Sequence, residues 1–138
     1  MPHPEIDLQR DARVGIIAYG TSHWAIVESR DQLRAEAGVE TSYLRIRAFP
    51  FTHEIGEFID AHDRVYVVEQ NRDGQMLGLL RQELAGAQIA KLTSVRHYNG
   101  LPIDARSVTE EIRAHEARMA LPPETSHEDA IVGAEEAV

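Results

Sequence analysis

The chain has 138 residues, a length that suits one domain built around a single hydrophobic core. Its formal net charge of -9 at pH 7 argues against a nucleic-acid or anionic-membrane surface, because phosphate groups would be repelled overall. The sequence contains no cysteine, which excludes disulfides, a cysteine nucleophile and thiolate-bound metal clusters within this chain.

The first expected elements form a strand–turn–helix unit. Residues 1–13 are polar and indicate a linker or a short edge strand around residues 6–8. The run Val14–Tyr19 is short and apolar, which predicts a buried strand. A helix is expected over residues 22–37, ending at Gly38 as its left-handed cap.

The second unit is predicted in the same way. Residues 39–49 alternate enough to indicate a strand, which Pro50 would stop. Thr52 is expected to cap a short helix over residues 53–62.

The third unit carries the densest group of polar side chains. Residues 65–68 form a β-branched and aromatic run that is too short for a helix, which predicts a central parallel strand. A helical stripe begins at Met76, and Gly86 is expected to end that helix. Gly78 lies inside the helix, and a close packing contact is the simplest reason to keep a glycine there.

The last predicted elements are a strand over residues 89–95 and a helix over residues 105–119 that Asp104 caps. Strands that alternate with helices predict a three-layer α/β/α domain over residues 14–120. Its mostly parallel sheet has four or five strands. Residues 121–138 are acidic and rich in small residues, and are expected to be a disordered tail.

Polar residues follow the predicted strands at their carboxyl ends, where binding surfaces of open α/β sheets gather. They supply hydrogen-bond donors and acceptors without a nucleophile, which favours contact with a partner over bond-breaking. Ordinary turn and helix-cap chemistry is the alternative. The candidate binding residues are Gly20, Thr21, Ser22, Glu69, Gln70, Asn71, Gly74, Gln75, Tyr98, Asn99 and Gly100.

The turn at residues 20–22 opens a helix, so its backbone N–H groups suggest an anion site. It lacks the further glycines of a dinucleotide-binding loop and the lysine of a P-loop. Ser22 as a plain helix cap is the alternative.

Histidines give no catalytic or metal pattern. His53 begins a sequence similar to the zinc-binding HExxH motif, but Glu57 stands where the second histidine should be. His23 and His97 lie near strand ends without a diagnostic partner for acid–base catalysis. No catalytic residue and no metal site are therefore predicted in this chain. The apolar runs are too short to span a membrane and no signal peptide is visible, so we expect a cytoplasmic protein.

Residues 14–114 resemble the C-terminal domain of the alpha subunit of 2-oxoacid:ferredoxin oxidoreductases, particularly the 2-oxoglutarate type. The most specific motif is VYVVEQNRDGQM at residues 65–76. It is accompanied by IIAYGTS at 16–22, YLRIRAFPF at 43–51 and YNGLP at 98–102. The resemblance implies a transketolase C-terminal-like fold, sometimes with one antiparallel edge strand.

The resemblance also implies a role within a larger enzyme. In that family the holoenzyme converts a 2-oxoacid and coenzyme A to the acyl-CoA, carbon dioxide and reduced ferredoxin. Thiamine diphosphate, Mg²⁺ and an iron–sulfur cluster lie in other domains or subunits, and this chain alone is expected to bind none of them. Its expected partners are the rest of the alpha subunit and the beta subunit.

The expected function is thus assembly and positioning rather than catalysis by the isolated chain. On this hypothesis, Glu69→Ala and Asn71→Ala weaken assembly more than they unfold the domain. A free-standing module that binds a nucleotide or phosphate at residues 20–22 is the alternative. An independent hydrolase or metalloenzyme would need a nucleophile or a ligand set that the sequence does not show.

Overall fold

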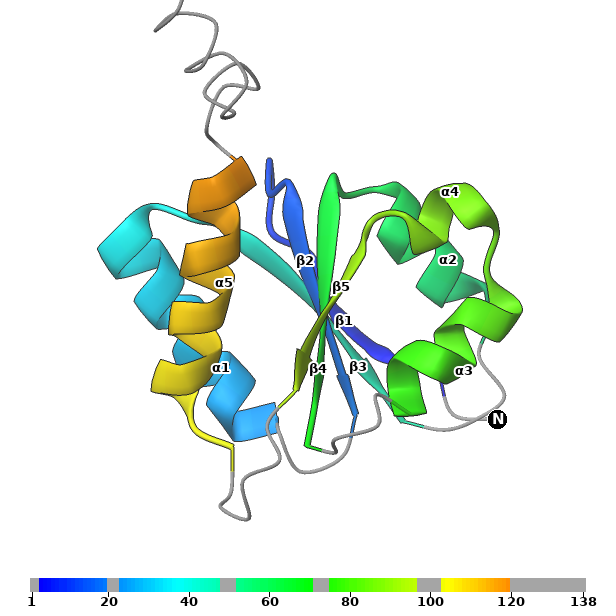
Figure 1. Ribbon diagram of the computed structural model, residues 1–138, viewed down its shortest axis with the longest axis horizontal. Helices are drawn as coiled ribbons and strands as arrows, with labels where there is room; N and C mark the ends of the chain where they lie inside the picture. Colours follow the sequence, from blue (N-terminus) through cyan, green and yellow to red (C-terminus); the bar gives the residue numbers. More distant parts are fainter. Residues whose placement is uncertain (1–2, 20–22, 48–51, 71–74, 97–102, 120–138) are drawn as a thin grey trace, which may run out of the picture.

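A computed structural model describes residues 3–19, 23–47, 52–70, 75–96 and 103–119. One five-stranded sheet forms the middle of the molecule, and helices cover both of its faces (Figure 1). The three-layer α/β/α fold predicted from the sequence is confirmed.

The sheet has the strand order β1-β3-β2-β4-β5. Strands β2 to β5 run parallel to their neighbours, whereas β1 pairs with β3 in the antiparallel direction. The predicted edge strand near residues 6–8 is therefore confirmed as β1. The strands are β1 (Glu5–Asp7), β2 (Val14–Tyr19), β3 (Thr41–Ile46), β4 (Arg64–Glu69) and β5 (Leu92–Arg96).

The helices occupy two layers, with α1 and α5 on one face of the sheet and α2, α3 and α4 on the other (Figure 1). Helix α1 continues into the π-helix η2. As the sequence predicts, Gly38 ends this helical segment with a left-handed φ of 67°. The elements are α1 (His23–Gln32), η2 (Leu33–Ala37), α2 (His53–Asp60), α3 (Gln75–Glu83), α4 (Gly86–Ile89) and α5 (Ala105–Met119).

Each face of the sheet has its own hydrophobic core, because successive side chains of a strand point to opposite faces. In β4, Tyr66 packs on the α1/α5 side, whereas Val65 and Val67 pack on the α2/α3 side. Strands buried on both faces explain why these segments are continuously apolar rather than alternating.

Buried polar contacts fix the outer elements to the sheet. Arg30 of α1 is 8% exposed and donates hydrogen bonds to the side chain and carbonyl oxygen of Thr41 and to Asp7 of β1. On the same face, Ser29 of α1 lies 2.7 Å from Thr109 of α5, hydroxyl to hydroxyl. These contacts join α1 to the edge strand and to α5.

Three local predictions are wrong. Gly86 begins the short helix α4 instead of ending α3, and β5 consequently starts only at Leu92. Thr52 occupies the cap position of α2 but makes no capping bond with its side chain, whose hydroxyl instead donates to Glu54. Gly78 has open space around it, so no close packing contact explains this glycine.

The end of the domain follows the prediction. Asp104 accepts a hydrogen bond from the backbone N–H of Ser107 and so caps α5. Residues 121–138 lie outside the described residues, so their predicted disorder stays a prediction. Within the described residues, no helix combines the length and the apolar character needed to cross a membrane.

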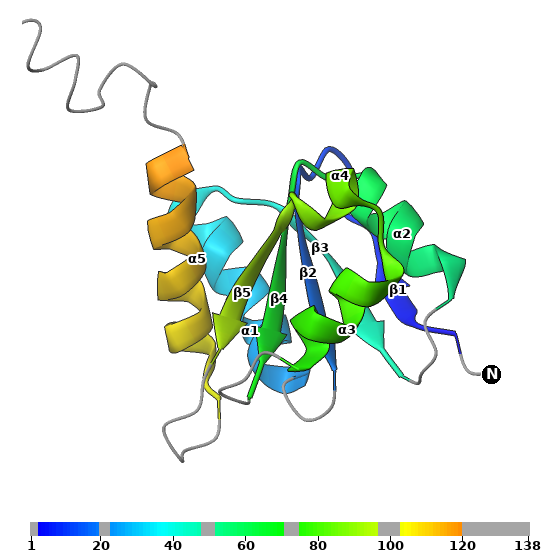
Figure 2. The same cartoon turned by 45° about the vertical axis from the view of Figure 1, so that its right-hand side comes forward.

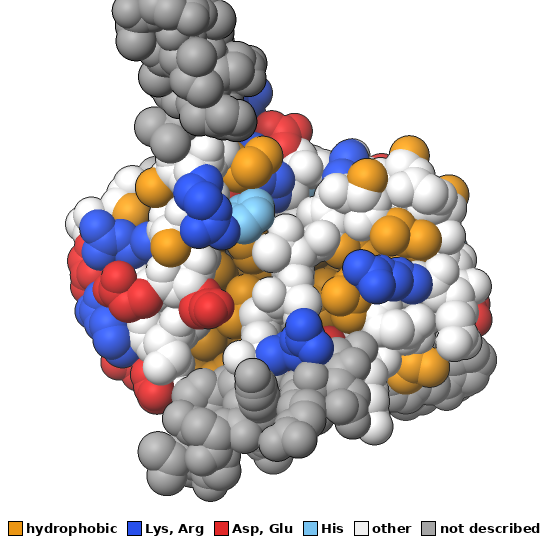
Figure 3. All heavy atoms as spheres, in the orientation of Figure 1, with side chains coloured by type: hydrophobic (Ala, Val, Ile, Leu, Met, Phe, Trp, Pro, Cys, Tyr) orange, Lys and Arg blue, Asp and Glu red, His pale blue; other side chains and the backbone are white. Residues whose placement is uncertain are grey.

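Strand β5 lies at the edge of the sheet, with β4 as its neighbour. In Figure 3, hydrophobic side chains gather near the middle of the face that is drawn, between the helices of the two layers. Val95 is the buried apolar residue of this strand, and Leu92 packs against the core of the α2/α3 face.

Candidate functional site

The carboxyl ends of β2 and β4 form the point at which the chain changes direction across the sheet. These strands are neighbours, yet α1, which follows β2, and α3, which follows β4, cover opposite faces (Figure 2). In open α/β sheets, the crevice between two such strands is the usual place for a binding site. The topology therefore indicates a binding site beside Tyr19 and Glu69, the last residues of the two strands.

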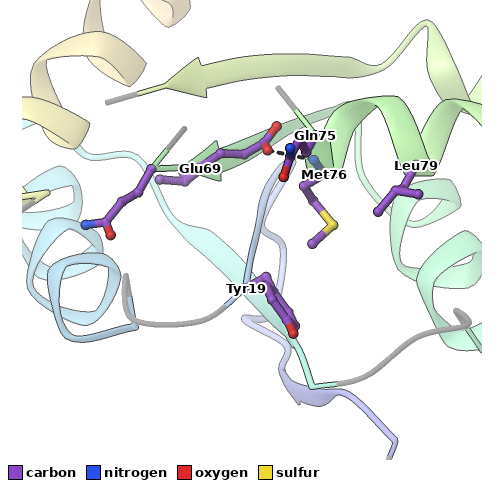
Figure 4. Close-up of a pocket in the computed structure, with 7 residues that line it drawn as sticks. Tyr19, Glu69, Gln75, Met76 and Leu79 are labelled. Atoms are coloured by element: carbon purple, nitrogen blue, oxygen red, sulfur yellow. Dashed lines mark hydrogen bonds between the residues drawn. The ribbon is translucent and has the colours of Figure 1, made fainter. Parts of the chain in front are cut away.

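A cavity of about 160 Å³ lies in this crevice, and Figure 4 shows its residues. Strand β2 contributes one wall, the end of β4 the second and the first turns of α3 the third. The lining residues are Tyr19, Val68, Glu69, Gln70, Gln75, Met76 and Leu79. We call this space the switch-point cavity.

Glu69 is the buried polar residue of the switch-point cavity, with an exposure of 4%. The backbone N–H groups of Met76 and Leu77 donate to its two carboxylate oxygens, at 2.6 and 3.0 Å. Figure 4 shows Glu69 beside Met76. A carboxylate in this position satisfies N–H groups that the first turn of a helix leaves without intrahelical partners, and it complements the positive end of the helix dipole. Glu69 thus ties the end of β4 to α3.

This arrangement determines what the cavity can bind. The first turn of α3 would otherwise be an anion site, but the chain's own carboxylate already occupies it. A phosphate or carboxylate ligand in the cavity would face the negative charge of Glu69. Gln70 and Gln75 are exposed and bring amide groups to the lining.

Large apolar side chains are exposed at the same end of the molecule. Tyr19 and Leu79 line the cavity and are 45% and 40% exposed, and Trp24, in the first turn of α1, is 76% exposed. Side chains of this size at one edge are typical of surfaces that contact another protein.

Three of the candidate binding residues lie around the cavity. They are Glu69, Gln70 and Gln75, and their expected contact with a partner stays a prediction. The structure also shows that Glu69 has a structural role, because its carboxylate accepts hydrogen bonds from the first turn of α3. The helix-cap alternative in the sequence only partly suggested this role. The other candidates, Gly20, Thr21, Ser22, Asn71, Gly74, Tyr98, Asn99 and Gly100, lie outside the described residues.

Sequence reasoning missed Leu79 as a site residue. Helix α3 packs on the core through an apolar stripe that includes Met76 and Leu80. Leu79 lies outside this stripe. A leucine away from the buried face of a helix was the available signal, since such a position normally carries a polar residue.

The histidines do not build a catalytic centre in the described part of the chain. His53 and Glu57 are both largely exposed, with 4.0 Å between their side chains. The Nδ1 atom of His23 lies 3.1 Å from the hydroxyl of Tyr43, a core residue, and His97 lies outside the described residues. Among the described residues, no three His, Asp or Glu side chains come together as a metal site would require.

A second polar cluster lies between the start of β4 and α5. Arg64 donates two hydrogen bonds of 2.7 Å to Glu116, and the hydroxyl of Tyr66 donates to the same carboxylate. Because that hydroxyl has one proton, the Nδ1–H of His115, 2.8 Å away, must donate to the Tyr66 oxygen.

The Glu116 cluster shifts the pKa values of its members. Burial would raise the pKa of Glu116, but the hydrogen bonds from Arg64 and Tyr66 outweigh burial and hold this pKa below its usual range. Burial and the neighbouring Glu116 carboxylate both raise the pKa of Tyr66. The cluster fixes α5 to the sheet at the end remote from the switch-point cavity.

Comparisons with known proteins agree with this architecture. No family model matches the chain. Over 95 residues, which are 67% of this chain, it is 32% identical to "2-oxoacid:ferredoxin oxidoreductase 2, subunit alpha" of Aeropyrum pernix. The chain spans 14% of the length of that relative.

Solved structures provide the fold comparison. A 2-oxoglutarate:ferredoxin oxidoreductase from Magnetococcus marinus matches 83% of this chain and 20% of its own, with a TM-score of 0.71 and 22% identity. The alpha chain of a probable 2-oxoacid ferredoxin oxidoreductase from Thermoplasma acidophilum matches 81% of this chain and 95% of its own, with a TM-score of 0.48 and 18% identity. The sequence similarity is to part of an alpha subunit, and the Magnetococcus structure shares the fold of this chain.

Proposed function

We propose that this chain is the C-terminal, transketolase-like domain of the alpha subunit of a 2-oxoacid:ferredoxin oxidoreductase, and that it assembles and positions the catalytic parts. The similarity to an alpha subunit over 95 residues is the observation that carries the proposal. The exposed apolar side chains at the carboxyl edge of the sheet support it, because they suit burial against a partner.

The proposed reaction belongs to the whole enzyme. It oxidatively decarboxylates a 2-oxoacid with coenzyme A, giving the acyl-CoA, carbon dioxide and reduced ferredoxin. We propose 2-oxoglutarate as the 2-oxoacid on the basis of the motif at residues 65–76. The proposed location is the cytoplasm, and the proposed partners are the rest of the alpha subunit and the beta subunit.

Neither the sequence nor the described residues show a ligand set for the cofactors of such an enzyme. The sequence has no cysteine to ligate an iron–sulfur cluster, and no three His, Asp or Glu side chains come together among the described residues. The carboxylate of Glu69 fills the helix terminus at which a diphosphate would otherwise be favoured. We therefore propose that thiamine diphosphate, Mg²⁺ and the cluster lie in partner domains or subunits.

On this proposal the domain contributes to the activity of the enzyme by positioning its catalytic parts. Its carboxyl edge docks against neighbouring domains and keeps the cofactor-bearing parts in register. Correct placement of reacting groups can supply a large share of a rate enhancement even when the placing residues do not touch the substrate.

Reconstitution tests the proposal. The remaining alpha-subunit domains and the beta subunit are assayed for benzyl-viologen reduction with 2-oxoglutarate and coenzyme A, with and without this chain. We expect full activity only when the chain is added. If it neither binds these partners nor changes the rate, while phosphate or a nucleotide raises its melting temperature, a free-standing ligand-binding module is the better account.

A further inference from the structure

The switch-point cavity has no assigned occupant in the function proposed above. We propose that it receives one uncharged apolar side chain from the rest of the alpha subunit, which thereby anchors that part of the subunit to this domain. This inference rests on the proposed function and names the partner chemistry of the same edge.

The size of the cavity favours a single side chain. Its volume of about 160 Å³ is below the range of about 300–1,000 Å³ that is typical of small-molecule sites. Pockets that take one anchor residue at the centre of an interface commonly contribute most of the binding free energy. A cavity of this size is therefore better suited to an anchor than to a cofactor.

The walls favour an apolar occupant. The ring of Tyr19 and the side chains of Met76 and Leu79 line the space, as Figure 4 shows. Met76 is 6% exposed, and its unbranched thioether can adapt to side chains of different shapes.

The charge distribution excludes acidic occupants. Glu69 lines the cavity, and a second carboxylate or a phosphate beside it would be repelled. The carboxylate also has no need of a basic side chain from the partner, because the N–H groups of Met76 and Leu77 already stabilise its charge. An uncharged occupant remains.

The source of the occupant follows from the comparisons and from the exposed surface. The similar segment is 14% of the length of the Aeropyrum alpha subunit, so most of such a subunit lies outside this domain and must pack against it. Tyr19 and Leu79 line the cavity with substantial apolar exposure. A partner that fills the cavity would cover both side chains at once.

The experiment measures binding of the remaining alpha-subunit domains, together with the beta subunit, to three forms of this chain: wild type, Leu79→Gln and Met119→Gln. Met119, on α5, is 53% exposed and does not line the cavity, so it is the matched control. We expect Leu79→Gln to raise the Kd at least tenfold and Met119→Gln to change it less than twofold. Both variants should melt close to wild type, because both positions are exposed.

The outcomes separate the two proposals. If the wild-type chain does not bind at all, the proposed function fails and this inference fails with it. If wild type and Leu79→Gln bind equally, the domain docks but the cavity is not its anchor site. If wild type instead sediments as a dimer that Leu79→Gln dissociates, a second copy fills the cavity and the inference is overturned.

Discussion

The carboxylate of Glu69 lies against the first turn of α3, with its Oε1 atom 2.6 Å from the backbone nitrogen of Met76. The last residue of the interior strand β4 is thus hydrogen-bonded to the helix that follows it on the α2/α3 face. This contact revises the expectation that Glu69 acts chiefly in assembly, because its loss would affect folding of the domain itself.

We expect Glu69→Ala to lower the free energy of unfolding by about 1–3 kcal/mol, since one buried and one half-buried backbone N–H group lose a charged acceptor. Gln70→Ala is the control, because Gln70 is exposed in the next position and should change stability by less than about 0.5 kcal/mol. Urea denaturation of both variants gives the comparison. Equal stability of Glu69→Ala and wild type would show that the cap contributes little. Asn71 lies outside the described residues, so its expected role in assembly stands.

Glu116→Gln should lower stability by about 1–3 kcal/mol at neutral pH, because Arg64 would lose a half-buried carboxylate partner that accepts two of its hydrogen bonds. The pKa of Glu116 is held below its usual range, so the carboxylate's contribution is complete above the unfolded-state pKa of about 4.3. It is lost as pH falls through the lower folded-state pKa.

The difference in unfolding free energy between wild type and Glu116→Gln should therefore be constant from about pH 7 to 5 and shrink towards pH 3. Thermal melts across this range check it. Glu110→Gln is the control, because Glu110 forms an exposed ion pair with Arg106 that should contribute less than about 1 kcal/mol. A difference that grows on acidification would contradict the lowered pKa of Glu116.

Replacing each of two glycines by alanine should change the stability of the domain in opposite directions. A Cβ atom on Gly15 would lie 2.7 Å from the ring of Phe58, so Gly15→Ala should cost about 1–3 kcal/mol through overpacking. A Cβ atom on Gly78 would meet no atom within 4 Å, and Gly78→Ala should stabilise α3 by about 0.5–1 kcal/mol. The melting temperatures of the two variants test both expectations. If Gly78→Ala lowered the melting temperature, glycine would be required at this position for a reason that the fold of the domain does not explain.

Trp24 provides an optical test of docking. It is the single tryptophan of the chain and is 76% exposed at the carboxyl edge. If this edge docks as proposed, the emission of Trp24 should shift to shorter wavelength when tryptophan-free partner domains are added. A Trp24→Phe variant supplies the background signal. Binding without any shift would place the interface elsewhere on the domain.

The regular elements were predictable because their patterns are local. The run Val14–Tyr19 is apolar throughout, and the structure places it between two other strands and buries every residue of it except Tyr19. Asp104 caps α5 as predicted, since a capping residue and its target lie three positions apart in sequence. Patterns of this kind require no knowledge of the tertiary fold.

The remaining features depend on contacts between distant segments. The hydrogen bond between Tyr66 and Glu116 joins β4 to α5, two elements that lie far apart in the sequence. No local sequence pattern predicts such a contact. The cap provided by Glu69 comes from outside α3, so the usual rule for the residue just before a helix does not find it. The start of α4 at Gly86 was missed because helical and loop preferences compete in such a short segment.

The position of β2 in the sheet has a consequence for how the chain folds as it is synthesised. Val14 pairs with Thr41 on one side and with Arg64 on the other, and both partners come later in the sequence. A nascent chain can therefore add β3 to β2 first, while the other edge of β2 waits for β4 to leave the ribosome. Pairing across long stretches of sequence slows folding and leaves strand edges open to wrong partners. The crevice between β2 and β4 can therefore form only after Arg64–Glu69 has been synthesised.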